Sequence, residues 1–188
     1  MTHANSLAAG REPRIAADAA PRARGVKLVL LDVDGVLTDG RIVFTGERSE
    51  AKHFSAQDGV GIRLAQRAGL RFGIITGRRS AALEMRAREL GITELHQNSL
   101  KKADAYRKIL ASTRLADEAI AYVGDDLVDL PIMKRAGFAA TVPEARPEVL
   151  RAAHFVSGRG CGRGAVREIL DFILRVQGAW KRATRDLI

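Results

Sequence analysis

The sequence of 188 residues has little cysteine and few aromatic residues. Its single cysteine, Cys161, has no partner for an internal disulfide, which argues against a disulfide-stabilised secreted protein and favours a cytoplasmic one. The sequence contains no apolar run of about 18 residues, so we expect no membrane-spanning helix and no membrane partner. Six Phe, two Tyr and one Trp are too few to provide the stacking rings of a nucleic-acid surface.

Positive charge, in contrast, is in excess. The chain has 31 Lys and Arg against 22 Asp and Glu, a formal net charge of +9. Clustered basic residues attract polyanions, but here they are scattered along the chain, so we expect no nucleic-acid partner. Hydrophobic residues make up 46% and charged residues 28% of the sequence, which is typical of a globular domain.

Short apolar runs alternate with helical patterns. The runs have the composition of strands buried on both faces of a parallel sheet, and they lie at residues 26–33, 71–75, 119–123 and 138–142. Apolar residues at helical spacing follow at residues 60–68, 80–90, 102–112 and 127–136. This alternation predicts an α/β fold with a doubly wound parallel sheet, in which ligands bind at the carboxyl ends of the strands.

Three segments differ from this pattern. Two extended runs within residues 41–54 surround a turn and predict a β-hairpin that projects from the sheet. Residues 1–25 lack sustained periodicity, so we expect a disordered or loosely attached leader before a core domain at residues 26–178. Residues 179–188 are expected to form a polar tail.

Two carboxylates, Asp32 and Asp34, follow the first predicted strand. Side chains at positions i and i+2 of a strand point the same way, so these acids would lie close together. A divalent cation between them relieves their repulsion, and oxygen ligands favour Mg²⁺. Acids are also common in turns after strands, but two of them around one buried valine exceed what a turn requires.

Further polar residues stand at the ends of other predicted strands or at the start of a helix. Thr76 suits a phosphate oxygen or a turn, and Lys102 suits a phosphate charge or an exposed helix surface. Asp125 and Asp126 could complete a metal site, with Asp129 one helical turn later orienting them. The alternative for these acids is the cap of a helix N-terminus.

The residues above form four signatures along the chain: the Asp32–Asp34 pair, Thr76, Lys102 and the acids at residues 125–129. In this order they resemble the signatures of the haloacid dehalogenase superfamily of phosphotransferases, which has a Rossmann-like sheet. The resemblance implies that Asp32 is the nucleophile that forms an aspartyl-phosphate, and that Asp34 is the general acid and then the base. It implies that Thr76 and Lys102 bind phosphoryl oxygens. The intervals between the signatures leave no room for a cap domain, which places the chain in the capless subclass.

The same resemblance implies a Mg²⁺ site. Its ligands would be Asp32, the backbone carbonyl of Asp34, and Asp125, and the bound ion would neutralise charge in the transition state. Asp126 and Asp129 would support these ligands.

A closer resemblance, over about residues 26–178, is to a capless family of this superfamily that hydrolyses an eight-carbon 3-deoxy ketosugar-acid phosphate in lipopolysaccharide precursor synthesis. It rests on DVDGVLTDG, the hairpin, the DGVGIR and IITGR segments, YVGDD and GRGAVREI. Arginine suits the substrate carboxylate, although each arginine here could instead lie on a solvated helix face. By position, the substrate contacts would be Asp34, Ser55, Ala56, Gln57, Asp58, Gly59, Arg63, Arg78, Arg86 and Lys102.

A capless site would be exposed to solvent, so we expect a homo-oligomer, a tetramer by this resemblance, in which the hairpin and a neighbouring subunit serve as the cap. The glycine-rich segment at residues 158–164 would reach a neighbouring site, with Cys161 where the family has Gly. Two alternatives stay open: a phosphatase for another ketoacid sugar phosphate, such as a nine-carbon sialic-acid-like one, and a non-catalytic relative.

Overall fold

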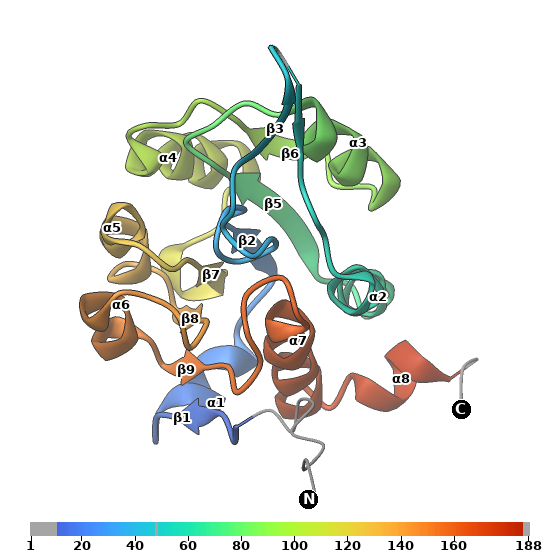
Figure 1. Cartoon of the computed structure of the whole chain (residues 1–188). Coiled ribbons are helices and arrows are strands. Elements are labelled where there is room, and N and C mark those ends of the chain that lie inside the picture. The colour runs from blue at the N-terminus through green and yellow to red at the C-terminus, as the bar shows by residue number, and fades with distance from the viewer. Residues whose placement is uncertain (1–10, 48, 186–188) are drawn as a thin grey trace, which may run out of the picture.

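A mainly parallel β-sheet forms the centre of the computed structural model, which describes residues 11–47 and 49–185 (Figure 1). Within these residues the sheet has seven strands in the order β1-β9-β8-β7-β2-β5-β6, and only β1 is antiparallel to its neighbour. The strands are β1 (Arg14–Ile15), β2 (Leu28–Leu31), β5 (Arg71–Ile75), β6 (Glu94–His96), β7 (Ile120–Val123), β8 (Phe138–Thr141) and β9 (Phe155–Val156). The predicted doubly wound α/β fold is therefore confirmed.

The predicted strands β2, β5, β7 and β8 occupy the middle of this sheet. All four residues of β2 are buried because helices cover both faces of the sheet. Leu31 pairs with Ile74 of β5 on one side and with Val123 of β7 on the other. These three strands therefore end at the same level, and the residues that follow them meet at one edge.

Helices pack on both faces of the sheet (Figure 1). One face carries α1 (Ala19–Arg24), α2 (Ala56–Arg67), α3 (Ala81–Glu89), α7 (Ala165–Val176) and α8 (Trp180–Thr184). The other carries α4 (Lys102–Thr113), α5 (Leu130–Met133) and α6 (Pro147–Ala152), and the short 3-10 helices are η1 (Asp117–Ala119) and η2 (Leu127–Asp129). No helix of the described residues is long and apolar enough to cross a membrane.

The predicted hairpin is present and lies apart from the main sheet. Strands β3 (Val43–Gly46) and β4 (Ser49–Ala51) pair only with each other, and they project beyond the carboxyl ends of the central strands (Figure 1). Within the described residues, this hairpin is the only sheet besides the central one, so no cap domain covers that edge.

The chain ends differ from expectation. Residues 1–10 of the expected leader lie outside the described residues, but residues 11–25 contain β1 and α1 rather than a loosely attached segment. Ala19 and Ala23 are fully buried, and Gln177 donates a hydrogen bond to the Ala23 carbonyl. In the expected polar tail, Trp180 begins α8 and lies 4.2 Å from the Arg175 guanidinium. Both short helices contact α7, and their small residues Ala19, Ala23 and Ala183 are buried there.

Candidate active site

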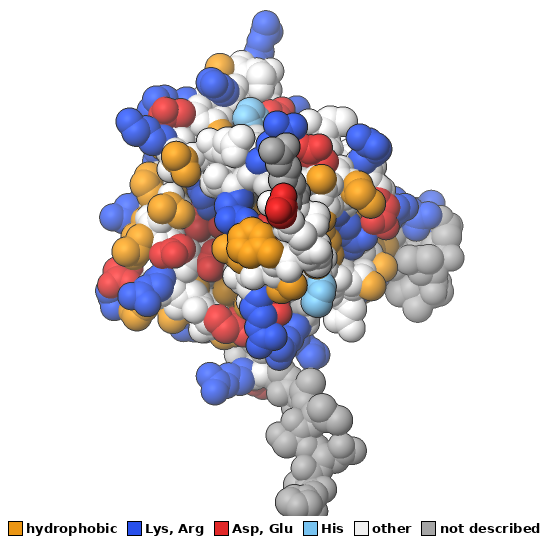
Figure 2. Space-filling model, turned by 45° about the horizontal axis from the view of Figure 1, so that its top comes forward, with side chains coloured by type: hydrophobic (Ala, Val, Ile, Leu, Met, Phe, Trp, Pro, Cys, Tyr) orange, Lys and Arg blue, Asp and Glu red, His pale blue; other side chains and the backbone are white. Residues whose placement is uncertain are grey.

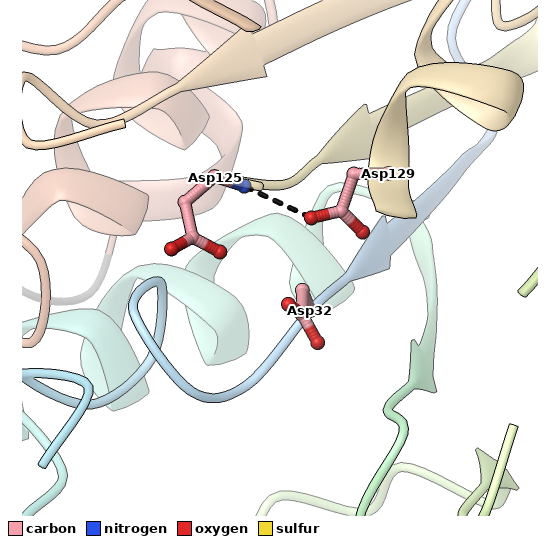
Figure 3. Close-up of side chains that lie close together, drawn as sticks. All are labelled: Asp32, Asp125 and Asp129. Atoms are coloured by element: carbon pink, nitrogen blue, oxygen red, sulfur yellow. Dashed lines mark hydrogen bonds between the residues drawn. The ribbon is translucent and has the colours of Figure 1, made fainter. Parts of the chain in front are cut away.

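Three carboxylates converge at the carboxyl edge of the central strands (Figure 3). Asp32 follows β2, Asp125 follows β7, and Asp129 ends η2. One oxygen of each lies within 4.8 Å of the others, and Asp32 and Asp129 are buried. The alignment of β2 with β7 brings the two strand ends together, as the sequence pattern predicts.

Burial and the repulsion of neighbouring carboxylates make Asp32 and Asp125 difficult to ionise. Burial raises the pKa of Asp125 to about 7, and the charges of Asp32 and Asp129 add to this effect. Burial likewise raises the pKa of Asp32 to about 6, with a contribution from Asp129 that Lys102 opposes. Buried carboxylates of this kind are stabilised as anions when a cation joins them.

The oxygen atoms of this cluster fit a hard divalent cation. Oδ1 of Asp125 is buried and has no hydrogen-bond partner among the described residues, which leaves a lone pair available to a metal. Gly35 lies directly against this carboxylate: a Cβ at that position would stand 2.1 Å from Oδ2 of Asp125, and its φ of +91° favours glycine. The backbone after β2 can therefore approach Asp125 only because residue 35 has no side chain.

Asp129 differs from Asp125 because both of its oxygens are occupied. Oδ1 accepts hydrogen bonds from Lys102 Nζ at 2.7 Å and from the Tyr122 hydroxyl at 2.6 Å. Oδ2 accepts from the backbone N–H groups of Asp125 and Asp126. These bonds fit a residue that orients its neighbours. The role of Tyr122 was missed because, from sequence, it is one more apolar residue in a buried strand.

Lys102 links the acids. It is the first residue of α4 and is buried, and its Nζ lies 2.8 Å from Asp32 Oδ2 as well as close to Asp129. Burial alone would lower the pKa of Lys102, but Asp32 and Asp129 raise it above its usual value. The structure therefore places this lysine inside the acidic cluster and not on an exposed helix surface.

Thr76 and Asp34 stand at the same edge. Thr76 directly follows β5 and is 3% exposed, and its hydroxyl accepts a hydrogen bond from the Arg78 backbone N–H at 3.4 Å. The Asp34 side chain is partly exposed, and Arg78 Nε lies 3.8 Å from its Oδ2. Arg78 also donates to Glu50 at 2.7 Å, which connects the strand end to the hairpin.

Asp34 has another neighbour that sequence reasoning missed, Lys52, which follows β4 and whose side chain is 2% exposed. Glu50 and Lys52 are separated by one residue in an extended segment, so both side chains face the active site. That spacing is visible in the sequence, but it does not reveal which way the hairpin turns.

The segment at residues 55–59 forms the start of α2. Ser55 caps this helix by accepting a hydrogen bond from the Asp58 N–H, while Ala56 and Gln57 are exposed. Asp58 is buried, and its Oδ1 accepts a hydrogen bond from the backbone N–H of Arg167 at 2.8 Å. Burial raises the pKa of Asp58. The Asp58 carboxylate therefore faces α7. The sequence predicted a substrate contact for Asp58 and did not predict this contact with α7.

Arg63 and Arg86 form a second cluster with Glu89. Arg63 donates to the Glu89 carbonyl at 3.0 Å and Arg86 to the Glu89 carboxylate at 2.8 Å. Arg86 also donates to the Ser55 carbonyl, and its Nη2 lies where a Cβ of Gly59 would stand. The structure thus brings Arg86 to the segment at residues 55–59, whereas Arg63 lies on the exposed side of α2.

Asp126 is exposed, and its side chain accepts a hydrogen bond from the Leu127 N–H. Together with Asp129 it forms a capping box at the start of η2. The side chain of Asp126 therefore caps a helix, which is the alternative interpretation given above. Its backbone N–H donates a hydrogen bond to Asp129.

The glycine-rich segment packs beside the Asp32 loop of its own chain. The Gly162 N–H donates to the Val36 carbonyl at 3.0 Å, and the Cys161 N–H donates to Glu144. Burial raises the pKa of the Cys161 thiol to about 11, so it carries no thiolate at neutral pH. Cys161 is accommodated here as a half-buried side chain.

The chain is similar to known phosphatases in sequence and in fold. Residues 82–169 match the family of haloacid dehalogenase-like hydrolases. The chain is 43% identical to the 3-deoxy-D-manno-octulosonate 8-phosphate phosphatase KdsC of Yersinia pestis, over 90% of this chain and 91% of that protein. Its identity to KdsC of Escherichia coli K12 is 42%, with 87% of each chain covered. A Moraxella catarrhalis phosphatase of the same name, solved with magnesium, phosphate and KDO, is 36% identical and superposes with a TM-score of 0.84 over 87% of this chain and 94% of that one.

Proposed function

Because the chain belongs to the haloacid dehalogenase-like hydrolases and, among them, to the 3-deoxy-D-manno-octulosonate 8-phosphate phosphatases, we propose that it hydrolyses this phosphate ester with Asp32 as the nucleophile. The observation that carries the proposal is the buried contact of Lys102 with both Asp32 and Asp129 beside Asp125. The products are the free sugar acid and phosphate.

Asp32 attacks phosphorus with a carboxylate oxygen and forms an aspartyl-phosphate. The attack needs the ionised carboxylate, which the ammonium group of Lys102 favours at 2.8 Å. Lys102 and Thr76 are then placed to bind oxygens of the phosphoryl group, on which negative charge is concentrated in the transition state. Asp129 holds Lys102 in this position through its own buried hydrogen bond.

Asp34 serves as acid and then base. Its carboxylate is 20% exposed, so a leaving group and a water molecule can reach it, whereas the Asp32 side chain is 9% exposed. The proton moves from Asp34 to the sugar oxygen as the ester bond breaks. Asp34 then accepts a proton from the water that hydrolyses the aspartyl-phosphate.

The cofactor is Mg²⁺, which the acidic cluster fits and which the Moraxella phosphatase contains. Asp32, Asp125 and the backbone carbonyl of Asp34 would hold it, with Asp126 and Asp129 supporting them. When bound, Mg²⁺ neutralises the negative charge that gathers on the phosphoryl group.

We propose that the sugar-acid portion is bound by Arg78, which lies beside Asp34, and by the exposed start of α2 at Ala56 and Gln57. Arginine can hold a carboxylate with two hydrogen bonds. Ser55, Asp58, Gly59, Arg63 and Arg86 are proposed to shape this region, because their contacts within the chain fix the start of α2 against α3 and α7.

We propose a homotetramer in which hairpins of neighbouring subunits cover the active sites. Apolar residues of this hairpin are exposed, and Phe44 is 73% exposed. The hairpin points toward the viewer in Figure 2, and an exposed hydrophobic patch (orange) lies beside it. Such a patch is expected to be buried in an assembly.

We place the protein in the cytoplasm, in lipopolysaccharide precursor synthesis. The lone cysteine supports the compartment, and the substrate named for its relatives supports the pathway. Lys and Arg side chains are spread over the face in Figure 2 without forming one basic stripe, which supports a small anionic substrate over a nucleic acid.

The experiment that tests the function is a phosphate-release assay with Mg²⁺ over a panel of sugar phosphates. We expect the highest kcat/KM for 3-deoxy-D-manno-octulosonate 8-phosphate. Equal or better turnover of a nine-carbon ketoacid phosphate would contradict the substrate, and no release from any member would favour a non-catalytic relative.

The matched variant is Asp32→Asn, which keeps the shape of the side chain but removes the nucleophilic carboxylate. We expect it to abolish Mg²⁺-dependent phosphate release while the circular dichroism spectrum stays unchanged. Normal turnover by this variant would contradict the covalent mechanism.

A further inference from the structure

A buried lysine outside the four sequence signatures contacts the proposed general acid. Nζ of Lys52 lies 2.5 Å from Oδ1 of Asp34 and 3.5 Å from Oε1 of Glu50, and only 2% of the lysine side chain is exposed. A buried ammonium group is destabilising unless it is paired. Asp34 and Glu50 provide that pairing, so the position of Lys52 is fixed from both sides.

The two oxygens of Asp34 have different surroundings. Among the described residues, its hydrogen bonds come from Lys52 and from the Thr38 hydroxyl, and both reach Oδ1. Oδ2 faces Arg78 Nε at 3.8 Å, which is beyond hydrogen-bond distance. Oδ1 is therefore held by the protein, while Oδ2 is left for a reacting group on the Arg78 side.

The contacts of Lys52 indicate that it acts through Asp34. Its ammonium group lies against Asp34 and Glu50, whereas the cation beside the nucleophile Asp32 is Lys102. Glu50 also binds Arg78 at 2.7 Å, so the same cluster fixes the hairpin to the loop after β5.

We propose that Lys52 is a positioning residue that holds Oδ1 of Asp34, so that Oδ2 carries the proton exchanged during catalysis. The inference rests on the proposed function, in which Asp34 is the acid and then the base. As the ester P–O bond breaks, its electron pair stays on the sugar oxygen, Oδ2–H gives that oxygen its proton, and the phosphoryl group forms a bond to Asp32. When water attacks phosphorus, Oδ2 takes a proton from the water, and the bond to Asp32 breaks to release phosphate.

The test compares two leaving groups in Lys52→Met, which has a chain of similar length without the charge. Sugar alkoxides need a proton to leave, whereas p-nitrophenolate leaves without one. We expect kcat for octulosonate 8-phosphate to fall by about 100-fold, the usual contribution of a placed general acid, with little change in KM. The burst of p-nitrophenolate release from p-nitrophenyl phosphate, measured by stopped flow, is expected to keep its wild-type rate.

Lys52→Arg, which retains a cation for Oδ1, is expected to recover part of the lost kcat. Lys108→Met, a change at an exposed lysine of α4, is the matched control and should behave as wild type. An equal loss with both leaving groups would overturn the proposal, and so would a higher KM with unchanged kcat, which would make Lys52 a substrate ligand.

A crystal structure of Lys52→Met separates this inference from the proposed function. We expect the Asp34 carboxylate to rotate about its side chain, and an unchanged carboxylate would overturn the positioning role whatever the substrate is. If octulosonate 8-phosphate is a poor substrate, the proposed function fails, and the leaving-group comparison uses the alkyl phosphate that the wild type hydrolyses best.

Discussion

Asp125 shows how one residue can depend on a ligand that the chain itself does not provide. Its carboxylate is enclosed by the backbone at Gly35 and by two other acids, and one oxygen has no hydrogen-bond partner among the described residues. The resulting pKa of about 7, above the usual 3.8, means that the folded protein holds this proton more tightly than the unfolded chain. Ionisation of Asp125 therefore destabilises the metal-free fold as the pH rises toward 7.

Magnesium binding should reverse this effect, because it requires the ionised carboxylate. From about pH 5 to about pH 8, Mg²⁺ affinity is expected to rise by at least about 100-fold, since below the pKa of Asp125 each bound ion must displace a proton from it. Asp32, whose pKa is raised to about 6, adds to this rise. Isothermal titration calorimetry in several buffers measures both the affinity and the released proton. Asp104→Asn, at an exposed position of α4, is the control; pH-independent affinity would contradict this account of Asp125.

At the scale of elements, contacts between helices are as important as the strands. Helix α7 begins at Ala165, and the preceding residue, Gly164, has no side chain to cap it. Asp58 of α2 accepts a hydrogen bond from the Arg167 N–H instead. One carboxylate thus joins the start of α2 to the first turn of α7 and to the glycine-rich segment before it.

Asp58→Ala removes this cap and is expected to lower the free energy of unfolding by about 1–2 kcal/mol, the usual cost of losing a helix cap. Asp58→Asn retains an acceptor oxygen and should lose less. Urea unfolding followed by circular dichroism measures both variants. If Asp58→Ala unfolds at the wild-type urea concentration but shows a raised KM, its main role is substrate contact.

The sequence predicts the central strands well because burial on both faces leaves a continuous apolar run that no solvent-facing residue interrupts. It does not predict β1 or β9, which are two residues long, nor α6, whose six residues hold little periodic signal. The strand-end acids could be predicted because parallel strands end at one edge. The contacts of Lys52 and Asp58 could not be predicted. Those of Lys52 depend on how the hairpin turns, and Asp58 accepts a hydrogen bond from a residue 109 positions away in the sequence.

At the scale of the molecule, the active site is covered by no domain of its own within the described residues, and apolar residues are exposed on the hairpin beside it. An open site of this kind would admit water and many phosphate esters. In an oligomer, a neighbouring subunit would cover the active site in place of a cap domain. We therefore expect the activity to depend on assembly.

Phe44→Ser is expected to shift the protein from a tetramer to smaller species and to lower activity at the same protein concentration, because it removes the most exposed aromatic side chain of the hairpin. Light scattering after size exclusion measures the mass. Leu100→Ser, at an exposed apolar position outside the hairpin, is the control. A fully active wild-type monomer would contradict the role of assembly.

The separation of the hairpin from the main sheet has a consequence for how such enzymes diversify. Because β3 and β4 pair only with each other, mutations at their outer positions leave the ladder of β2, β5 and β7 intact. Selection can therefore change the size, charge or sequence of this ribbon, and with it the molecules admitted, while the chemistry is inherited unchanged. Glu50 and Lys52 connect the ribbon to Arg78 and Asp34, so these two positions, together with the exposed Phe44, limit which changes the ribbon can accept.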